Sequence, residues 1–171
     1  SFTTKIMIIN IPSTESKLIQ ELMPFLKPSI THQVWLVGGF IRDLLNGKKE
    51  CFDIDLTLSF NPFKAAKEYA QETNSGLVIL DDERHIVRIV RTLSDGKSYT
   101  FDLSEFRAEN IDGDLKARDF TFNSIAAPLF EKNSLLRENK IELYDPLNGS
   151  EALQKRILSP CSDSLFVDDP L

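Results

Sequence analysis

The chain has 171 residues, 42% of them hydrophobic and 27% charged, as expected for one globular domain or for one domain and the beginning of another. No apolar run approaches the roughly 20 residues that a membrane-spanning helix requires, so we expect neither a membrane-spanning nor a disordered protein. The net charge of −6 argues mildly against nucleic-acid binding, although acidic residues gathered at a metal site would contribute to it. Cys51 and Cys161 form no C-x-x-C pair, which favours neither a zinc site nor a disulfide and fits a reducing cytoplasm.

The N-terminal part predicts a helix, a strand, a tight turn and a second helix, in that order. A residue of Ser13-Thr14 can cap an amphipathic helix that continues to Leu26. Residues 33–37 then predict a buried strand, which ends at the glycine pair Gly38-Gly39. Residues 40–47 predict a short helix with a glycine at its C-terminal end.

The middle of the chain predicts three strands and one helix. Residues 52–58 alternate polar and apolar side chains with a period of two, as in a strand, and residues 62–71 predict a helix with proline near its first turn. Residues 85–91 and 98–103 predict two further strands around the hairpin-like loop Ser94-Asp95-Gly96-Lys97. We therefore expect a mixed sheet.

The C-terminal part predicts fewer elements. The pattern is helical from Arg118 through Ala127, residues 140–144 predict a last strand, and residues 150–156 predict a short helix. No internal repeat or low-complexity segment divides the chain.

The glycine pair is a candidate phosphate-binding turn. Gly38 and Gly39 allow the backbone to turn sharply and to approach a ligand closely, and the N–H groups of the following helix favour an anion. Arg42, about one turn into that helix, could reach a phosphate oxygen. Taken alone, these residues are explained better by a plain tight turn and by a surface ion pair between Arg42 and Asp43.

Two aspartates form a candidate metal site. Asp53 and Asp55 are two residues apart, so both carboxylates project from the same face of a strand, and Mg²⁺ prefers such oxygen ligands. Asp102 could add a third carboxylate if its strand lies beside that of Asp53. A solvated carboxylate, or one paired with Arg107, explains Asp102 nearly as well.

A third candidate segment lies at residues 115–126. Phe120 and Phe122 there fit a core position, and Asp119 could serve as a helix cap. Arg118, Asp119 and Asn123 together supply a donor, an acceptor and an amide, which are the groups that would recognise the phosphate and ribose of a nucleotide.

Four motifs in order resemble one protein family. They are Leu36-Val37-Gly38-Gly39-Phe40-Ile41-Arg42-Asp43, Asp53-Ile54-Asp55, Arg118-Asp119-Phe120-Thr121-Phe122-Asn123-Ser124-Ile125 and Tyr144-Asp145-Pro146-Leu147-Asn148-Gly149. From Gln33 to Leu171 the chain is similar to the head domain of class II tRNA nucleotidyltransferases, the CCA-adding enzymes, and of bacterial poly(A) polymerases.

The resemblance implies an α/β (α+β) fold of the polymerase beta type, with a small mixed sheet and helices mainly on one face. It implies Mg²⁺-dependent addition of CMP and AMP, from CTP and ATP, to the 3′ end of tRNA in the cytoplasm. The implied catalytic residues are Asp53, Asp55 and Asp102, with the metal on the first two. The implied nucleotide-binding residues are Gly38, Gly39, Arg42, Arg118, Asp119 and Asn123.

The resemblance also implies a domain division and leaves rival functions open. Residues 1–32 would form an N-terminal segment and helix packing on the head, residues 33–158 the head, and residues 159–171 the start of a neck. The stretch from Arg107 to Asp114 is shorter than the family's flexible loop, so CC-only addition stays open beside full CCA addition. An A-adding enzyme, a poly(A) polymerase and a non-catalytic RNA- or nucleotide-binding module also fit the motifs. A generic α/β nucleotide-binding fold would predict a G-x-G-x-x-G or P-loop motif, and neither occurs.

Overall fold

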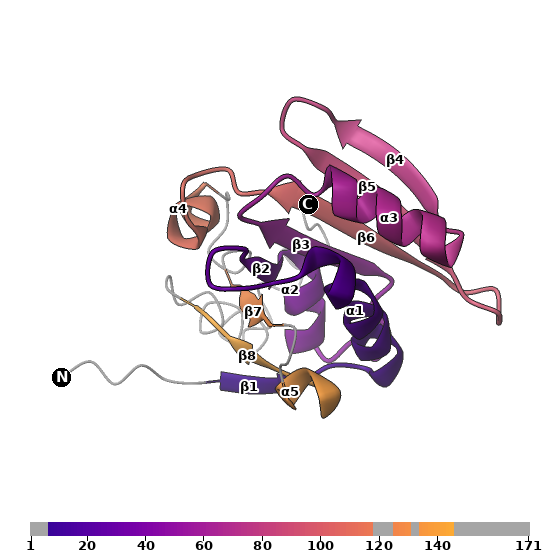
Figure 1. Cartoon of the computed structure of the whole chain (residues 1–171). Helices are drawn as coiled ribbons and strands as arrows, with labels where there is room; N and C mark the ends of the chain where they lie inside the picture. Colours follow the sequence, from indigo (N-terminus) through magenta and orange to yellow (C-terminus); the bar gives the residue numbers. More distant parts are fainter. Residues whose placement is uncertain (1–6, 118–124, 131–133, 146–171) are drawn as a thin grey trace, which may run out of the picture.

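The structure is a computed structural model that describes residues 7–117, 125–130 and 134–145 (Figure 1). Its elements in chain order are β1 (Met7–Asn10), α1 (Ser13–Leu26), β2 (Val34–Val37), α2 (Gly39–Leu45), β3 (Asp53–Leu58), α3 (Phe63–Thr73), β4 (Gly76–Asp81), β5 (Ile86–Thr92), β6 (Ser98–Glu105), α4 (Ile111–Lys116), β7 (Ala127–Leu129), α5 (Ser134–Arg137) and β8 (Lys140–Leu143).

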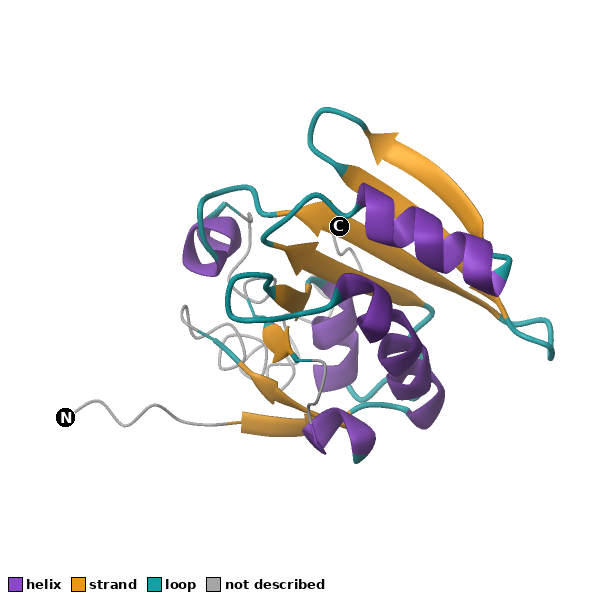
Figure 2. Cartoon of the chain, in the orientation of Figure 1, coloured by secondary structure: helices purple, strands orange, loops and turns teal. Residues whose placement is uncertain are grey.

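A six-stranded sheet in the order β4-β5-β6-β3-β2-β7 is the centre of the fold (Figure 2). The central strands β3 and β6 are parallel, whereas the other neighbours in this sheet are antiparallel. The sheet is therefore mixed, as the sequence predicts. A separate antiparallel pair joins β1 to β8, so the two ends of the described chain lie side by side.

One face of the large sheet carries the hydrophobic core. Alternate residues of its strands point to this face, because successive side chains in a strand point to opposite sides. Leu36 and Ile54 are examples, and both are fully buried in one cluster with residues of α1, α2 and α3. These three helices thus cover the same face, which confirms the expected helix-on-one-face arrangement.

The opposite face is only partly covered. A smaller apolar cluster there contains Val37 from β2 together with Ile111 and Leu115 from α4, and Trp35 and Tyr144 pack against it. Toward β6 and β5 this face carries Thr100, Asp102 and Ser104 on β6, and Arg88 between Ile86 and Val90 on β5. The division matters because the candidate carboxylates lie on this second face.

Most of the predicted elements are confirmed, with two corrections and several additions. Ser13 is the first helical residue of α1 and Pro12 precedes it, so neither Ser13 nor Thr14 caps the helix with its side chain. The helix expected to reach Ala127 is wrong at its described end, since Ala126 forms a bridge with Tyr144 and Ala127 begins β7. The elements β1, β4, α4, β7 and α5 were not expected. The helix expected at residues 150–156 lies outside the described residues.

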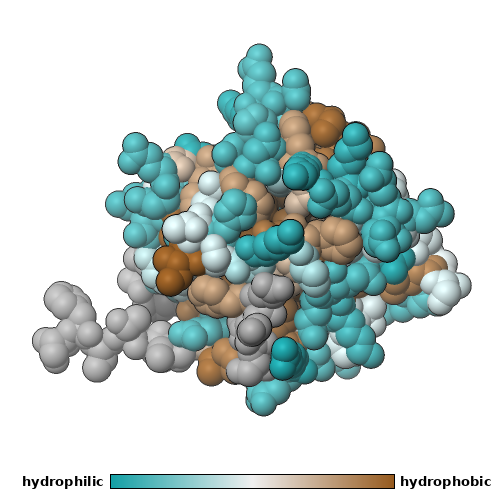
Figure 3. Space-filling model, in the orientation of Figure 1, coloured by the Kyte–Doolittle hydropathy of each residue, from teal (hydrophilic) through white to brown (hydrophobic). Residues whose placement is uncertain are grey.

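The surface is largely hydrophilic in the view of Figure 3, with hydrophobic residues in small separate groups. The edge strand β4 is the main exception among the described elements, because Val78 and Ile79 remain about half exposed. None of the described helices combines the length and apolar character needed to cross a membrane.

A buried glutamate connects α1 to the segment that leads into β3. Glu15 is 1% exposed, and its Oε2 accepts a hydrogen bond from the backbone N–H of Cys51 at 2.9 Å. Burial raises the pKa of Glu15, and the hydrogen bond from Cys51 offsets part of that effect. Because Asp53 follows Cys51 closely, this contact helps to fix where β3 starts.

Replacing Glu15 with alanine should lower the free energy of unfolding by about 1–3 kcal/mol, because the buried Cys51 N–H loses its acceptor. Glu15→Gln keeps an acceptor oxygen and is the matched control.

Since the folded-state pKa of Glu15 lies above its unfolded value, this group binds its proton more tightly in the folded chain, and its contribution to stability grows as the pH falls. Urea unfolding at several pH values should show this pH-dependent contribution to the free energy of unfolding in the native chain, and E15Q should lack it. Equal stability of E15A and the native chain would contradict this role.

Candidate functional site

Strand pairing brings three predicted aspartates to the open face of the sheet. Asp53 and Asp55 lie on β3, and Asp55 is directly opposite Asp102 on the parallel neighbour β6. The side chain of Asp53 is exposed, whereas Asp55 and Asp102 are half-buried. The structure thus places Asp102 beside the strand of Asp53, which was the condition for a third carboxylate.

The glycine pair lies against this carboxylate group. In the antiparallel pairing of β2 with β3, Val37 is opposite Asp55, so Gly38 follows at the same end of the sheet. Gly38 has φ +69° and ψ −142°, a conformation that is essentially restricted to glycine. A Cβ atom at Gly38 would lie 3.3 Å from Oδ2 of Asp55. Glycine is therefore required at position 38 by its backbone and by its neighbour.

The side chain of Arg42 lies against the same glycine turn. A Cβ atom at Gly39 would lie 3.1 Å from Nη2 of Arg42 and 3.9 Å from Oδ2 of Asp55, so the guanidinium and the carboxylate flank the same short piece of backbone. Nη2 of Arg42 also lies 3.2 Å from Oδ1 of Asp43, which is the surface ion pair that the sequence left open. Asp43 has a second cation 3.5 Å away, Nζ of Lys48. Arg42 could therefore turn to a phosphate while Asp43 keeps a partner.

Asp102 is paired with an arginine that lies in none of the sequence motifs. Nε and Nη2 of Arg88 donate to Oδ1 and Oδ2 of Asp102 at 2.8 and 3.0 Å. Arg107, the partner considered from the sequence, donates its backbone N–H to Oδ1 of Asp114. Residues 85–91 predict a strand, but Arg88 shares its face with Ile86 and Val90, so the sequence does not mark that face as polar. Only the pairing of β5 with β6 shows which carboxylate Arg88 meets.

The carboxylate pair fits a hard divalent cation. Two carboxylates on one face repel each other unless a cation offsets the charge, and oxygen ligands are those that Mg²⁺ uses while it keeps waters and substrate phosphates in its other positions. Within residues 7–117, 125–130 and 134–145, no group of three or more acidic, histidine or cysteine side chains is arranged to hold a metal. Asp53 and Asp55 are the candidate metal ligands because both lie on the open face of β3.

The third predicted segment cannot be placed. Arg118, Asp119 and Asn123 lie outside the described residues. The described residues on either side of them do converge on the glycine turn, because Leu115 and Ala126 belong to the same small apolar cluster as Val37.

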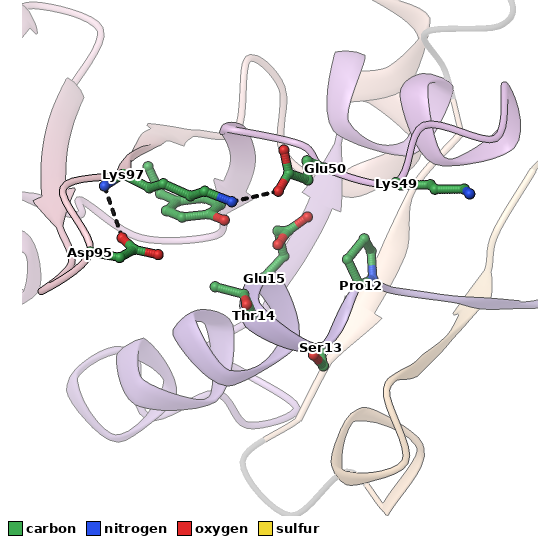
Figure 4. Close-up of a pocket in the computed structure, with 9 residues that line it drawn as sticks. Pro12, Ser13, Thr14, Glu15, Lys49, Glu50, Asp95 and Lys97 are labelled. Atoms are coloured by element: carbon green, nitrogen blue, oxygen red, sulfur yellow. Dashed lines mark hydrogen bonds and ion pairs between the residues drawn. The ribbon is translucent and has the colours of Figure 1, made fainter.

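A separate polar cavity of about 330 Å³ lies on the helix side of the fold (Figure 4). It is lined by the start of α1, by Lys49 and Glu50, and by the hairpin loop between β5 and β6, and the ion pair of Lys97 with Glu50 at 2.7 Å crosses it. Tyr99, which lines the cavity, is buried on the helix-covered face of β6. The next residue, Thr100, is paired with Asp53, so both of these residues point to the other face. The cavity is thus distinct from the carboxylate site.

Comparison with known proteins gives a family match over most of the chain. The model of the poly A polymerase head domain matches residues 34–159, which include the glycine turn, the carboxylate strand and the segment that contains Arg118. The matched range also includes β3 to β6, so it covers the sheet that carries the site.

Individual relatives agree with this match. A CC-adding tRNA nucleotidyltransferase from Synechocystis is 32% identical over 90% of this chain and 34% of its own length. An A-adding tRNA nucleotidyltransferase from Deinococcus radiodurans is 33% identical over 80% of this chain and 27% of its own length. The solved Thermotoga maritima CCA-adding enzyme complexed with tRNA is 27% identical, with a TM-score of 0.64 over 98% of this chain and 39% of that one. The chain thus spans about a third of the length of the curated relatives that it matches.

Replacing Gly38 with alanine should destabilise the fold and disturb the carboxylate beside it. The backbone conformation costs about 1–3 kcal/mol for a residue with a Cβ, and the added carbon would press on Asp55. Gly47→Ala is the matched control, because Gly47 also has a positive φ, +80°, with nothing within 4 Å of its Cβ position. Both variants should lose stability in urea unfolding, and only G38A should bind Mn²⁺ more weakly in a calorimetric titration. Equal Mn²⁺ binding by both variants would contradict a contact between the turn and the metal site.

Proposed function

The chain belongs to the poly A polymerase head domain family, and from this premise we propose that it is the catalytic head of a nucleotidyltransferase that adds CMP and AMP to the 3′ end of tRNA. One observation carries the proposal most directly. The glycine turn lies against the carboxylate strand, with the Cβ position of Gly38 3.3 Å from Oδ2 of Asp55. A phosphate-binding turn and a metal-binding pair therefore share one site.

The proposed reaction is an in-line displacement at the α-phosphate of CTP or ATP. The 3′ hydroxyl of tRNA gives up its proton to water, and its oxygen forms the new bond to the α-phosphorus. The bond from that phosphorus to the oxygen that bridges to the β-phosphate breaks, and pyrophosphate leaves. Nucleotidyltransferases of this family use a divalent metal, for which we propose Mg²⁺. When bound, it would offset the negative charge on the phosphates during transfer.

The position of each site residue within the described part of the chain supports a specific role. Asp53 and Asp55 would hold the metal on the open face. The backbone N–H groups after Gly38, together with the guanidinium of Arg42, would bind the triphosphate. We also propose Asp102 as a member of the catalytic group, since it lies opposite Asp55. Positioning and charge then supply most of the catalysis, and no covalent enzyme intermediate is needed.

Arg118, Asp119 and Asn123 complete the proposal as residues around the sugar and the incoming nucleotide. Support comes from the family match, which includes them, and from Leu115 and Ala126, which lie in one cluster with Val37 beside the turn. We further propose residues 33–158 as the head, 1–32 as a segment packing on it and 159–171 as the start of a neck. The packing of α1 in the main core is compatible with this division. A tRNA substrate favours a cytoplasmic location.

Replacing either Asp53 or Asp55 with asparagine should abolish nucleotide incorporation, because the metal loses a charged ligand while the shape of the side chain is kept. Asp95→Asn is the control, since Asp95 lies in the exposed loop between β5 and β6. Incorporation of labelled CMP should fall by about 10³-fold or more in D53N and D55N, in line with the several kcal/mol that a metal supplies. Circular dichroism should show an intact fold. Metal-dependent incorporation by a folded D53N variant would overturn the assignment.

The named relatives differ in the nucleotide they add, so a second experiment must separate CCA addition from CC-only, A-only and poly(A) addition. Labelled CTP and ATP are offered separately to tRNAs that end before the first C, before the second C and before the terminal A. The assay uses this chain and any longer protein that contains it. We expect C addition to the first two substrates and A addition to the third. Failure on the third would mark a CC-adding enzyme, A addition alone an A-adding enzyme, and long A tails a poly(A) polymerase.

A further inference from the structure

One transverse row of charges crosses the open face of the sheet. Arg88 on β5 is directly opposite Asp102 on β6, and Asp102 is directly opposite Asp55 on β3. The row therefore runs from a cation through one carboxylate to the carboxylate that lies against the glycine turn. Arg88 belongs to none of the four motifs that carry the family resemblance.

The contact between Arg88 and Asp102 uses both carboxylate oxygens. The two hydrogen bonds, of 2.8 and 3.0 Å, come from two nitrogens of one guanidinium and fix the plane of the carboxylate. An exposed pair of this kind usually contributes little to stability. Here the geometry matters for a different reason, because both oxygens of Asp102 accept hydrogen bonds from the same guanidinium.

Arg88 also interacts electrostatically with the two proposed metal ligands, Asp53 and Asp55. The pKa of its guanidinium is raised first by the hydrogen bonds and charge of Asp102, and to a smaller extent by the charges of Asp53 and Asp55. One cation thus lies in the field of all three carboxylates. Asp55 and Asp102 are like charges directly opposite each other, which is destabilising, and the charge of Arg88 offsets their repulsion.

We propose that Arg88 is a positioning residue that holds Asp102 out of metal coordination and serves as the internal counter-ion of the site. The proposal deepens the proposed function, on which it rests. The metal is then bound by Asp53 and Asp55 alone, and Asp102 acts through its fixed place beside Asp55. Two carboxylates leave more metal positions for the triphosphate than three would.

Replacing Arg88 with methionine removes the cation and both donors but keeps a long side chain. Asp102 is then released toward the site, and Mn²⁺ should bind to the nucleotide-free chain roughly fourfold more tightly or better, since a unit positive charge roughly 10 Å away, at about two strand spacings, no longer repels the doubly charged ion. Binding is read from the electron paramagnetic resonance signal of free Mn²⁺. Arg88→Lys, which keeps the charge, should stay close to the native affinity.

Two further variants make the result specific. Arg84→Met removes another arginine that pairs with an aspartate, Asp81, in the turn before β5, and it should leave Mn²⁺ affinity unchanged. The double variant R88M/D102N should lose the gain, because the released carboxylate is then absent. Unchanged or weaker Mn²⁺ binding by a folded R88M variant would overturn the proposal. Since this measurement needs no nucleotide transfer, it is independent of the D53N assay that tests the function itself.

Discussion

The site depends on the contact between the backbone of Gly38 and the carboxylate of Asp55. β2 and β3 run antiparallel, so the end of the first strand meets the beginning of the second, and Val37 lies opposite Asp55. The chain must then turn directly over that carboxylate, in a conformation that only glycine adopts readily. A phosphate held by the turn and a metal held by the aspartates would therefore be neighbours.

The alternation of side chains along the strands places the core residues on one face of the sheet and the candidate catalytic residues on the other. Ile54 points to the helix-covered face and is fully buried, whereas its neighbours Asp53 and Asp55 point to the open face. The helices α1, α2 and α3 can thus stabilise the sheet without covering the carboxylates. Glu15 extends this support, since its hydrogen bond to Cys51 anchors the chain just before β3.

Features that depend on residues close together in the sequence were predicted correctly, whereas features that depend on contacts between distant segments were missed. The period-two pattern around Asp53 and the glycine pair are local signals, and both gave correct elements. The partner of Asp102 is not local, because it depends on which strand lies beside β6, and so Arg88 was missed. The edge strand β4 was missed although it is strongly apolar, and Ala127 was assigned to a helix. Short apolar segments of this kind fit a strand or a helix equally well until their neighbours are known.

The central claim is that the glycine turn and the aspartate pair form one site for a metal and a triphosphate. Its most direct test is to titrate the chain with a non-hydrolysable CTP analogue, with and without Mn²⁺, in an isothermal calorimeter. The account predicts that Mn²⁺ tightens binding of the analogue in the native chain, and that this metal dependence disappears in D55N. Binding of the analogue with the same affinity in the presence and absence of Mn²⁺ would contradict the account.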